Sequence, residues 1–600
     1  MNENVLRKRN EIPVEDTWCM EDMYATDELW EEEQQKLENL ADEVAAYKGT
    51  LAKSGASLLG FFKKGDEIAY YRSRVIVYAN QRNHQDTAVS KYQGYVAKAE
   101  HAAVKVAAAM SFAKPEILAI PESRLQEMME EEPGLKKYER RLKEILRAKP
   151  HTLSEAEEKL VAMAGEALSG AENTFSMLNN ADIKFPTIRD VEGKRIPLTN
   201  GNFVVLEKSK DRSLRKQAFE GLYHTYERLG NTIASIYLNQ VNANEFYAAA
   251  AKYPSARAMF MDEGNIPETV YDSLIEAVHA HLPAVHRYVG LRKQLLGVEK
   301  LHMYDVYVPI VESVEHKYTF EEAKEIVLKA LAPMGEEYVS ILKEGFDNRW
   351  IDVYQNENKR TGAYSWGAYG THPYVLLNFQ GDLDSVFTLA HEMGHAIHTY
   401  YSNKTQDITY SSYLIFVAEV ASTCNESLLM HYLLENTTDP KERRYLINHF
   451  LESFRATVYR QTMFAEFEKI VHERKEAGEP LTKEVLNQIY HDLVALYFGP
   501  EMVVDEEIDC EWMKIPHFYT SFYVYQYATG YSAATAFSKK ILKEGKSAVD
   551  QYVGNFLCGG CSKDPIDLLK AAGVDMSTPK PVEDALSVFE EYLKMFEQQM

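Results

Sequence analysis

Residues 383–401 read LDSVFTLAHEMGHAIHTYY, a segment that combines an apolar helical pattern with histidines and acidic residues. Its apolar residues recur three and four positions apart, which predicts a helix with one buried face. That face contains Val386, Phe387, Ala390, Met393 and Ile397. Asp384 or Ser385 can cap the start of the helix, because short polar side chains accept hydrogen bonds from the first free backbone N–H groups.

The predicted helix carries the pattern H-E-x-x-H at residues 391–395. His391 and His395 lie just over one turn apart on one face, where both imidazoles can bind one metal ion. Glu392 lies about 100° around the helix, where it can act on water without binding the metal. The same letters also occur by chance on amphipathic helices, so the pattern alone leaves both interpretations open. Gly394 costs about 1 kcal/mol relative to Ala in mid-helix, which indicates that another segment packs closely there.

A third ligand is predicted from residues 413–434, YLIFVAEVASTCNESLLMHYLL, which have the composition of a buried helix. Glu419 would be a costly buried carboxylate unless it met a cation or a metal. We therefore predict that it completes a three-residue zinc site with one position open. Glu426, two turns further on, is either a hydrogen-bond acceptor for a ligand histidine or a surface acid. His398 is expected in the core or beside the ligands, because a fourth protein ligand would close the site.

Residues 515–537, IPHFYTSFYVYQYATGYSAATAF, combine His517 with several tyrosines. Imidazole and phenol groups can donate hydrogen bonds to an oxyanion that develops during hydrolysis. Aromatic residues at this spacing are also common in protein cores, so the pattern alone does not choose between catalysis and packing.

Composition excludes several classes of partner. The chain has 600 residues and a net charge of 66 − 90 = −24, which repels phosphate backbones and anionic lipid. No apolar stretch approaches the roughly 20 residues of a membrane span, and the N-terminus lacks the apolar core of a signal peptide. Five cysteines, odd in number and mostly far apart, favour a reducing compartment. We expect a cytoplasmic protein without nucleic-acid or membrane partners, and its oligomeric state stays open.

The pattern along the chain predicts a mostly α fold with two domains. A helical lobe at residues 1–200 ends in a β-hairpin region, and residues 201–600 form the catalytic domain. The strands of that region are predicted from IKFPTIRD, KRIPLT and FVVLEK, with turns at Glu192-Gly193 and Asn200-Gly201. GAYSWGAYGTHPYVLLNF predicts a small sheet beside the H-E-x-x-H helix, ending in the strand Tyr374 to Phe379.

Together these motifs resemble the oligoendopeptidase F branch of the thimet oligopeptidase-like zinc metallopeptidase family. The resemblance includes HEMGHAIHTY, FVAEVASTCNES, GAYSWGAYGTHPYVLLNF and IPHFYTSFYVYQYATGYS, and it extends to residues 175–186 and 198–219. It implies a zincin-type helical ellipsoid with a deep substrate channel. It also implies that His391, His395 and Glu419 bind one zinc ion and that Glu392 is the general base. His517 and Tyr523 would contact the scissile carbonyl oxygen, with Tyr527 nearby against the substrate.

The implied activity is hydrolysis of internal peptide bonds in short oligopeptides, which would be the partners of the chain. One alternative is a zinc exopeptidase of the dipeptidyl carboxypeptidase or carboxypeptidase type, which uses the same metal chemistry. A second is a non-catalytic peptide-binding protein, which would have no use for Glu392. The strand Tyr374 to Phe379 is expected to align the peptide by strand addition. Cys558-Gly-Gly-Cys561 is interpreted as a tight turn before a helix at Pro565.

Overall fold

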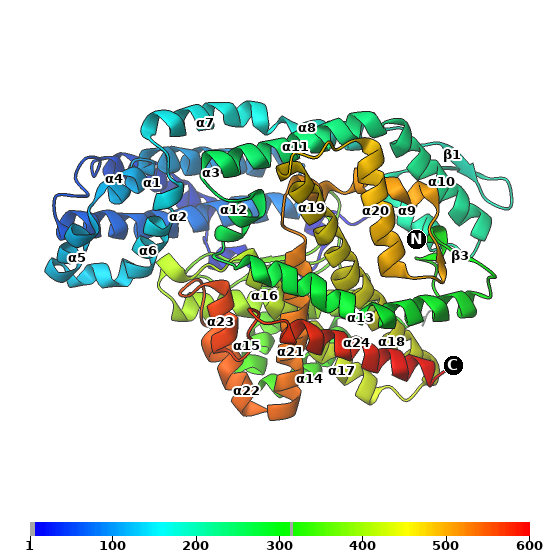
Figure 1. Cartoon of the computed structure of the whole chain (residues 1–600). Helices are drawn as coiled ribbons and strands as arrows, with labels where there is room; N and C mark the ends of the chain where they lie inside the picture. Colours follow the sequence, from blue (N-terminus) through cyan, green and yellow to red (C-terminus); the bar gives the residue numbers. More distant parts are fainter. Residues whose placement is uncertain (1–5, 313–315) are drawn as a thin grey trace. The chain divides into compact units, whose positions relative to one another are not determined.

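Helices dominate the computed structural model of the chain, which describes residues 6–312 and 316–600 (Figure 1). The strands of the described residues form only a three-stranded sheet and two two-stranded sheets. The prediction of a mostly α fold is therefore confirmed. The chain divides into two units, of which unit 1 comprises Met1–Pro150, His316–Tyr432 and Phe537–Val574. Unit 2 comprises His151–Glu315, Leu433–Ala536 and Asp575–Met600.

The predicted domain boundary at residue 200 lies inside unit 2, at the start of a helix. Each unit is assembled from three separate stretches of the chain, because the backbone passes repeatedly from one unit to the other. The division into residues 1–200 and 201–600, and the deep channel implied by the resemblance, stay predictions.

Unit 1 opens with three long helices that pack against one another (Figure 1). They are α1 (Asp27–Ala45), α2 (Gly55–Gln85) and α3 (Ser90–Met110). Trp30 of α1 is fully buried, stacks on Tyr95 of α3 at 3.9 Å between ring centroids, and donates to Val75 O of α2 at 3.0 Å. One aromatic side chain thus joins all three helices. The shorter helices α4 (Ala113–Ala119), α5 (Glu122–Glu131) and α6 (Glu139–Arg147) follow.

A three-stranded sheet lies in the middle segment of unit 1, as predicted. Its strands are β4 (Ile351–Asp352), β5 (Tyr364–Trp366) and β6 (Tyr374–Leu376), in the order β4-β6-β5. β6 is parallel to β4 and antiparallel to β5, with Val375 opposite both Ile351 and Ser365. The prediction that Tyr374 to Phe379 receives a substrate strand is wrong, because β6 is the central strand and both of its sides are paired. β5 forms one edge of the sheet.

Two helices of unit 1 follow this sheet and cross each other. α16 (Leu383–Thr405) begins seven residues after the end of β6. α17 (Ile415–Asn436) crosses α16 near the middle of α16. All five residues of the predicted apolar face of α16 are buried. The cap is Asp382 rather than Asp384 or Ser385: its carboxylate accepts from Ser385 N at 2.9 Å and from Ser385 Oγ at 2.6 Å. Ser385 is thus a partner of the cap, three residues into the helix.

Gly394 explains how closely these two helices approach. A Cβ atom built on Gly394 would lie 2.6 Å from Ser422 Cα and 2.9 Å from Ala421 O, both backbone atoms of α17. Backbone atoms cannot move aside as a flexible side chain does, so only glycine fits here. The expectation that another segment packs closely against Gly394 is confirmed.

The Cys558–Cys561 segment of unit 1 is a tight turn before α23 (Pro565–Ala571), as predicted. Gly560 has a φ of +51°, and a Cβ there would lie 2.0 Å from Tyr410 O. Both cysteines are free thiols. Further helices of unit 1 are α14 (Phe320–Ala330), α15 (Glu336–Asp347) and α22 (Lys546–Gln551).

Unit 2 contains the predicted hairpin, formed by β1 (Thr187–Arg189) and β2 (Arg195–Pro197). The third predicted strand, FVVLEK, is wrong, because its first five residues belong to the helix α9 (Asn200–Glu207) and Lys208 is the C-cap of that helix. Thr199 Oγ1 accepts from Asn202 N at 3.1 Å, and Asn202 Oδ1 accepts from Thr199 N at 2.8 Å. This reciprocal capping box starts the helix where the sequence predicts a turn.

The rest of unit 2 is almost entirely helical within its described residues. Its helices are α7 (Glu155–Leu168), α8 (Gly170–Met177), α10 (Arg212–Arg228), α11 (Gly230–Ala250), α12 (Ala256–Asp262), α13 (Glu268–Leu296), α18 (Pro440–Phe454), α19 (Arg460–Glu476), α20 (Lys483–Phe498) and α24 (Lys580–Glu597). α13 packs against α19, α20 and α24. β3 (Leu301–His302) pairs in parallel with β7 (Met502–Val503). α21 (Tyr525–Glu544) spans the boundary of the units in the sequence.

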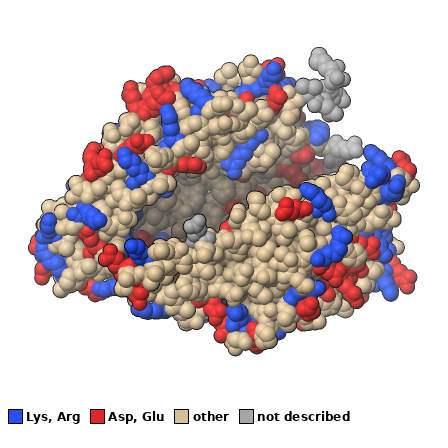
Figure 2. Space-filling model, turned by 90° about the horizontal axis from the view of Figure 1, so that it is seen from above, with Lys and Arg blue, Asp and Glu red and all other residues tan. Residues whose placement is uncertain are grey.

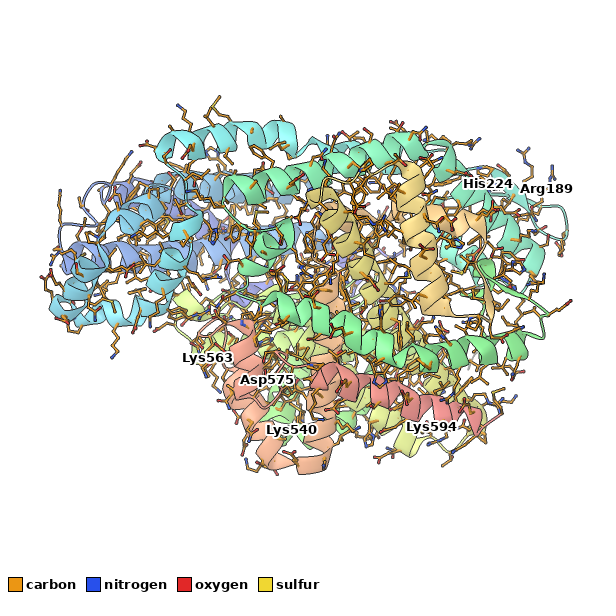
Figure 3. The ribbon with its side chains drawn as sticks, in the orientation of Figure 1. Arg189, His224, Lys540, Lys563, Asp575 and Lys594 are labelled. Atoms are coloured by element: carbon orange, nitrogen blue, oxygen red, sulfur yellow. The ribbon has the colours of Figure 1, made fainter. Side chains whose placement is uncertain are left out.

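Charged side chains of both signs are interspersed on the face shown in Figure 2. Exposed charges such as Lys563 in unit 1 and Lys594 in unit 2 lie on the outside of their own units (Figure 3). Across the described residues, no helix has both the length and the apolar character that crossing a membrane requires.

Replacing Gly394 by Ala should destabilise the protein although Ala is the better helix former. We expect Gly394→Ala to lower the free energy of unfolding by about 2 kcal/mol, because the new methyl group overlaps the backbone of α17. Urea denaturation measures the change. Gly94→Ala is the matched control, because Gly94 is exposed in α3 with open space around it and should gain about 0.5 to 1 kcal/mol. Equal stability of Gly394→Ala and the parent protein would contradict the packing argument.

Candidate metal centre

Three predicted ligands converge where α16 and α17 cross. Glu419 Oε2 of α17 lies 3.3 Å from His391 Nε2 and 3.4 Å from His395 Nε2 of α16. One ligand atom from each residue lies within 4.8 Å of the others. In the part of the chain that the structure describes, no other set of three His, Cys, Asp or Glu residues meets this condition.

The helix that carries Glu419 is open along one narrow strip. From Phe416 to Met430 every residue is buried except Glu419, Glu426 and Ser427. The side chain of Glu419 is 34% exposed, so it is less buried than the sequence pattern predicts. Burial raises the pKa of Glu419, but the hydrogen bonds from His391 and His395 outweigh that effect and hold the pKa well below its ordinary value. The carboxylate is therefore ionised and accessible, as a metal ligand must be.

Glu426 lies directly behind one of the candidate ligands. His391 Nδ1 donates a hydrogen bond to Glu426 Oε1, and this bond would keep a proton on Nδ1 when Nε2, on the side of Glu419, gives up its own proton to bind a metal. Of the two interpretations of Glu426, the hydrogen-bond acceptor is thus the one that the geometry favours. A carboxylate in this position orients the imidazole and makes it a stronger ligand.

Two further polar residues of α17, which were not predicted from the sequence, stabilise the site. Ser422 Oγ donates to Glu419 Oε2 at 3.1 Å. Asn425 Nδ2 donates to Ala390 O of α16 at 3.1 Å, and Asn425 Oδ1 accepts from Tyr338 OH at 2.8 Å. Both residues are fully buried polar residues in an apolar run, which is the signal that could have identified them.

Glu392 combines burial with an unsatisfied carboxylate oxygen. The residue is 7% exposed, and its Oε2 has no hydrogen-bond partner among the described residues. Burial raises the pKa of Glu392, and the nearby acids Glu419 and Glu426 act in the same direction against His391 and His395. A carboxyl group with a raised pKa and a free oxygen beside metal ligands has the properties of a general base.

His398 lies in the core and not among the ligands. It is 1% exposed and stacks on Tyr413 with 3.8 Å between ring centroids and 6° between planes. Burial lowers the pKa of His398 to about 3, so the ring is neutral at physiological pH. Its predicted core position agrees with these contacts.

The other predicted catalytic residues belong to unit 2, where they form a cluster of their own. The ring centroids of His517 and Tyr523 lie 6.5 Å apart, and Tyr527 lies 6.0 Å from His517 and 5.3 Å from Tyr523. Burial lowers the pKa of His517, which favours the neutral imidazole. That these residues act at the metal centre of unit 1 stays a prediction.

The residues of the centre fit a zinc ion. The set of two imidazole nitrogens and one carboxylate oxygen is the donor set of catalytic zinc sites, which leave one position open. Three carboxylates around two imidazoles favour a divalent cation, and Glu426 supplies the outer hydrogen bond that metal-binding histidines usually have.

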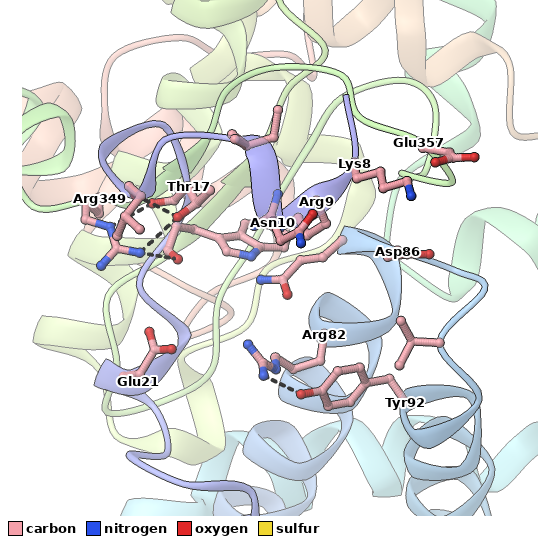
Figure 4. A pocket seen from close by; sticks show the side chains of 15 residues that line it. Lys8, Arg9, Asn10, Thr17, Glu21, Arg82, Asp86, Tyr92, Arg349 and Glu357 are labelled. Carbon is pink, nitrogen blue, oxygen red and sulfur yellow. Dashed lines mark hydrogen bonds between the residues drawn. The ribbon is translucent and has the colours of Figure 1, made fainter. Parts of the chain in front are cut away.

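A separate cavity of about 640 Å³ lies in unit 1 against the N-terminal segment (Figure 4). Its arginines already have partners: Arg349 donates to Thr17 O at 2.9 Å, and Arg82 donates to Tyr92 OH. None of the three candidate metal ligands lines this cavity, so it is not the metal centre.

Comparisons with known proteins agree over nearly the full chain. The profile of the family described as Peptidase family M3 matches residues 205–588, and one described as Oligopeptidase F matches residues 116–185. Oligopeptidase PepF of Bacillus subtilis (strain 168) is 50% identical over 595 residues, which cover 99% of this chain and 89% of that protein. A protein of known structure from Chlamydophila abortus is 34% identical with a TM-score of 0.92, covering 99% of this chain and 100% of that one. Oligoendopeptidase-F from Enterococcus faecium is 39% identical with a TM-score of 0.75, covering 96% and 99% respectively.

Removing the carboxylate of Glu426 should weaken metal binding without unfolding the site. We expect Glu426→Ala to raise the dissociation constant for zinc about 10- to 100-fold, because His391 loses the acceptor that fixes its ring. Competition with a chromophoric chelator measures the constant directly and does not depend on activity. Glu344→Gln, an exposed acid on α15 of the same unit, is the control and should bind zinc as the parent does. An unchanged constant in Glu426→Ala would refute this role.

Proposed function

The chain belongs to peptidase family M3 and is a metallo-oligopeptidase, and we propose that it is a zinc-dependent endopeptidase that hydrolyses internal bonds of short peptides. The predicted resemblance to the oligoendopeptidase F branch is confirmed. The observation that carries the proposal is the convergence of His391, His395 and Glu419 beside Glu392, whose Oε2 has no hydrogen-bond partner in the part of the chain that the structure describes.

His391 Nε2, His395 Nε2 and Glu419 Oε2 would hold the zinc ion. When bound, zinc supplies Lewis acidity, which polarises a peptide carbonyl and makes water nucleophilic near neutral pH. Glu392 takes the proton of the attacking water at Oε2, the oxygen that is free in this structure. It then passes that proton to the nitrogen of the leaving amine, so the carboxylate returns to its starting state.

His517 and Tyr523 would donate hydrogen bonds to the oxyanion of the substrate, with Tyr527 against the peptide nearby. Support for this assignment comes from the clustering of the three side chains within unit 2 and from the neutral state of His517. A donor aimed at the developing charge typically contributes a few kcal/mol to transition-state stabilisation.

β5, rather than β6, would align the substrate peptide by strand addition. β5 is an edge strand of the sheet and packs against α16, the helix with both histidines. An extended peptide at this edge would form main-chain hydrogen bonds with β5. These bonds would align its backbone with the strand, largely independently of the peptide's sequence.

Two alternatives use the same site differently. A zinc exopeptidase needs groups that capture a peptide terminus, whereas an endopeptidase accepts peptides blocked at both ends. A non-catalytic peptide-binding protein has no need for a buried carboxyl such as Glu392, whose burial without a partner is costly.

We also propose that short peptides are the partners and that the protein works in the cytoplasm. Five free thiols, at Cys19, Cys424, Cys510, Cys558 and Cys561, support a reducing compartment.

Glu392→Gln should separate metal binding from catalysis. We expect the variant to bind zinc as the parent does, while kcat for an internally quenched peptide falls at least about 100-fold, because an amide cannot accept the proton of water. Metal analysis of the purified protein and fluorescence assays measure the two properties. Turnover close to that of the parent would eliminate Glu392 as the base.

Peptides with an acetylated N-terminus and an amidated C-terminus should be cleaved at internal bonds. Mass spectrometry of products from a series of blocked peptides of increasing length identifies each bond that is cut, and a chelator-treated sample is the control. Cleavage of unblocked peptides alone, with dipeptides or single residues released from one end, would favour the exopeptidase instead.

A further inference from the structure

The residue immediately before Tyr523 has a strained backbone. Phe522 has a φ of +55°, in the left-handed region that bulky side chains rarely adopt. Such strain costs on the order of 1–3 kcal/mol, and it persists only where the surroundings enforce it. Groups in unit 2 must therefore hold Phe522 in this conformation.

A buried carboxyl group holds the peptide of Phe522. Phe522 N donates to Glu468 Oε1 of α19 at 2.7 Å, and Glu468 is 1% exposed. The Phe522 ring is 3% exposed and lies against Phe260, Tyr271 and His472, with centroid distances of 5.8, 6.0 and 4.7 Å. Both the backbone and the side chain of the strained residue are thus fixed.

A second connection fixes the preceding residue, Ser521. Asn244 Nδ2 of α11 donates to Ser521 Oγ at 2.7 Å and to His472 Nε2 at 3.0 Å. His472 Nδ1 in turn donates to the backbone oxygen of Glu468 at 2.8 Å. The Asn244 amide and the His472 imidazole thus join α11, α19 and the turn in a single hydrogen-bond network.

We propose that Glu468 is a positioning residue for the reaction: its carboxyl holds the left-handed turn at Phe522, and that turn sets the position of Tyr523. The inference rests on the proposed function, in which Tyr523 contacts the oxyanion. It assigns Glu468 no contact with the substrate.

Among the described residues, no opposite charge acts on the carboxyl of Glu468. Burial raises the pKa of Glu468 to about 8, while the Phe522 N–H acts in the opposite direction. Tyr237 of α11 and Tyr271 of α13 face it, and both are buried with pKa values raised by burial. His472 on its own helix has a pKa lowered to about 4 by burial. At pH 7 the carboxyl is therefore mainly neutral, and its carbonyl oxygen is the acceptor that glutamine also provides.

The test compares Glu468→Gln with Glu468→Leu at pH 7. Glutamine keeps an acceptor for Phe522 N, so kcat should stay within about threefold of the parent. Leucine has a similar volume but no acceptor, so kcat should fall at least about tenfold with KM within about twofold. Glu473→Leu, an exposed position on the same helix, is the matched control and should leave kcat unchanged.

A double-mutant cycle with Tyr523→Phe distinguishes positioning from general stability. If Glu468 acts through Tyr523, Glu468→Leu should cost no more than about twofold in kcat when Tyr523 is already phenylalanine. A loss as large as in the parent background would overturn the proposal, as would a folded Glu468→Leu variant with full kcat. Should Glu468→Leu fail to fold, Ser521→Ala, which removes only the contact with Asn244, replaces it in the same cycle.

The outcome is separable from the proposed function. An inactive Glu392→Gln variant together with an unchanged kcat in Tyr523→Phe would leave the zinc peptidase standing and overturn the role of Glu468. An active Glu392→Gln variant would instead refute the proposed mechanism of water activation, whatever Glu468 does.

Discussion

The close approach of α16 and α17 at Gly394 is the constraint on which the metal centre depends. Gly394 immediately precedes His395, and Ser422 lies three residues after Glu419, so the point of closest backbone contact is one residue from one ligand and one turn from another. A separation of 3.4 Å between His395 Nε2 and Glu419 Oε2 follows from that crossing. The hydrogen bond from Asn425 to Ala390 O fixes the rotation of α17 about its axis. A larger residue at position 394 would separate the ligands although none of them is changed.

The distribution of polar residues on α17 allows the helix both to pack in the core and to present carboxylates at the candidate metal centre. Almost all sides of the helix are buried, which fixes its position. From Phe416 to Met430 its partly exposed residues lie along the strip with Glu419 and Glu426. The seven-residue spacing puts these carboxylates two turns apart on one face, so Glu419 faces the imidazole Nε2 atoms and Glu426 accepts from Nδ1 of His391. With Glu392, three carboxylates surround two imidazoles. Burial raises the pKa of Glu392 most, the two neighbouring acids add to that effect, and a divalent cation would relieve the repulsion between the three groups.

The sequence predicts those parts of the site that depend on local spacing. The four-residue interval between His391 and His395 fixes their common face, and Glu419 is conspicuous as an acid in an apolar helix. Non-local pairing is different: that β6 is central depends on the contact of Val375 with Ile351, 24 residues away. Residues 203–208 have β-branched character, yet the capping box at Thr199 and the burial of Phe203 and Leu206 make them helical. Helix periodicity likewise cannot tell which side of α17 its neighbours leave uncovered, so the partial exposure of Glu419 was not predictable.

The two groups of predicted catalytic residues are held in place by different physical means. The packing of α16 fixes the position of ligands on that helix, such as His391, because small displacements in a close-packed interior are costly. Tyr523 instead follows a loop residue with an unfavourable φ, and a loop has no periodic hydrogen bonds to restore its shape. Phe522, five residues after His517, occupies a buried aromatic pocket against Tyr271 and His472. A tyrosine in that pocket would be enclosed by Tyr271 and His472, whereas the next residue, Tyr523, is half-buried. The carboxyl of Glu468 holds the turn that precedes it.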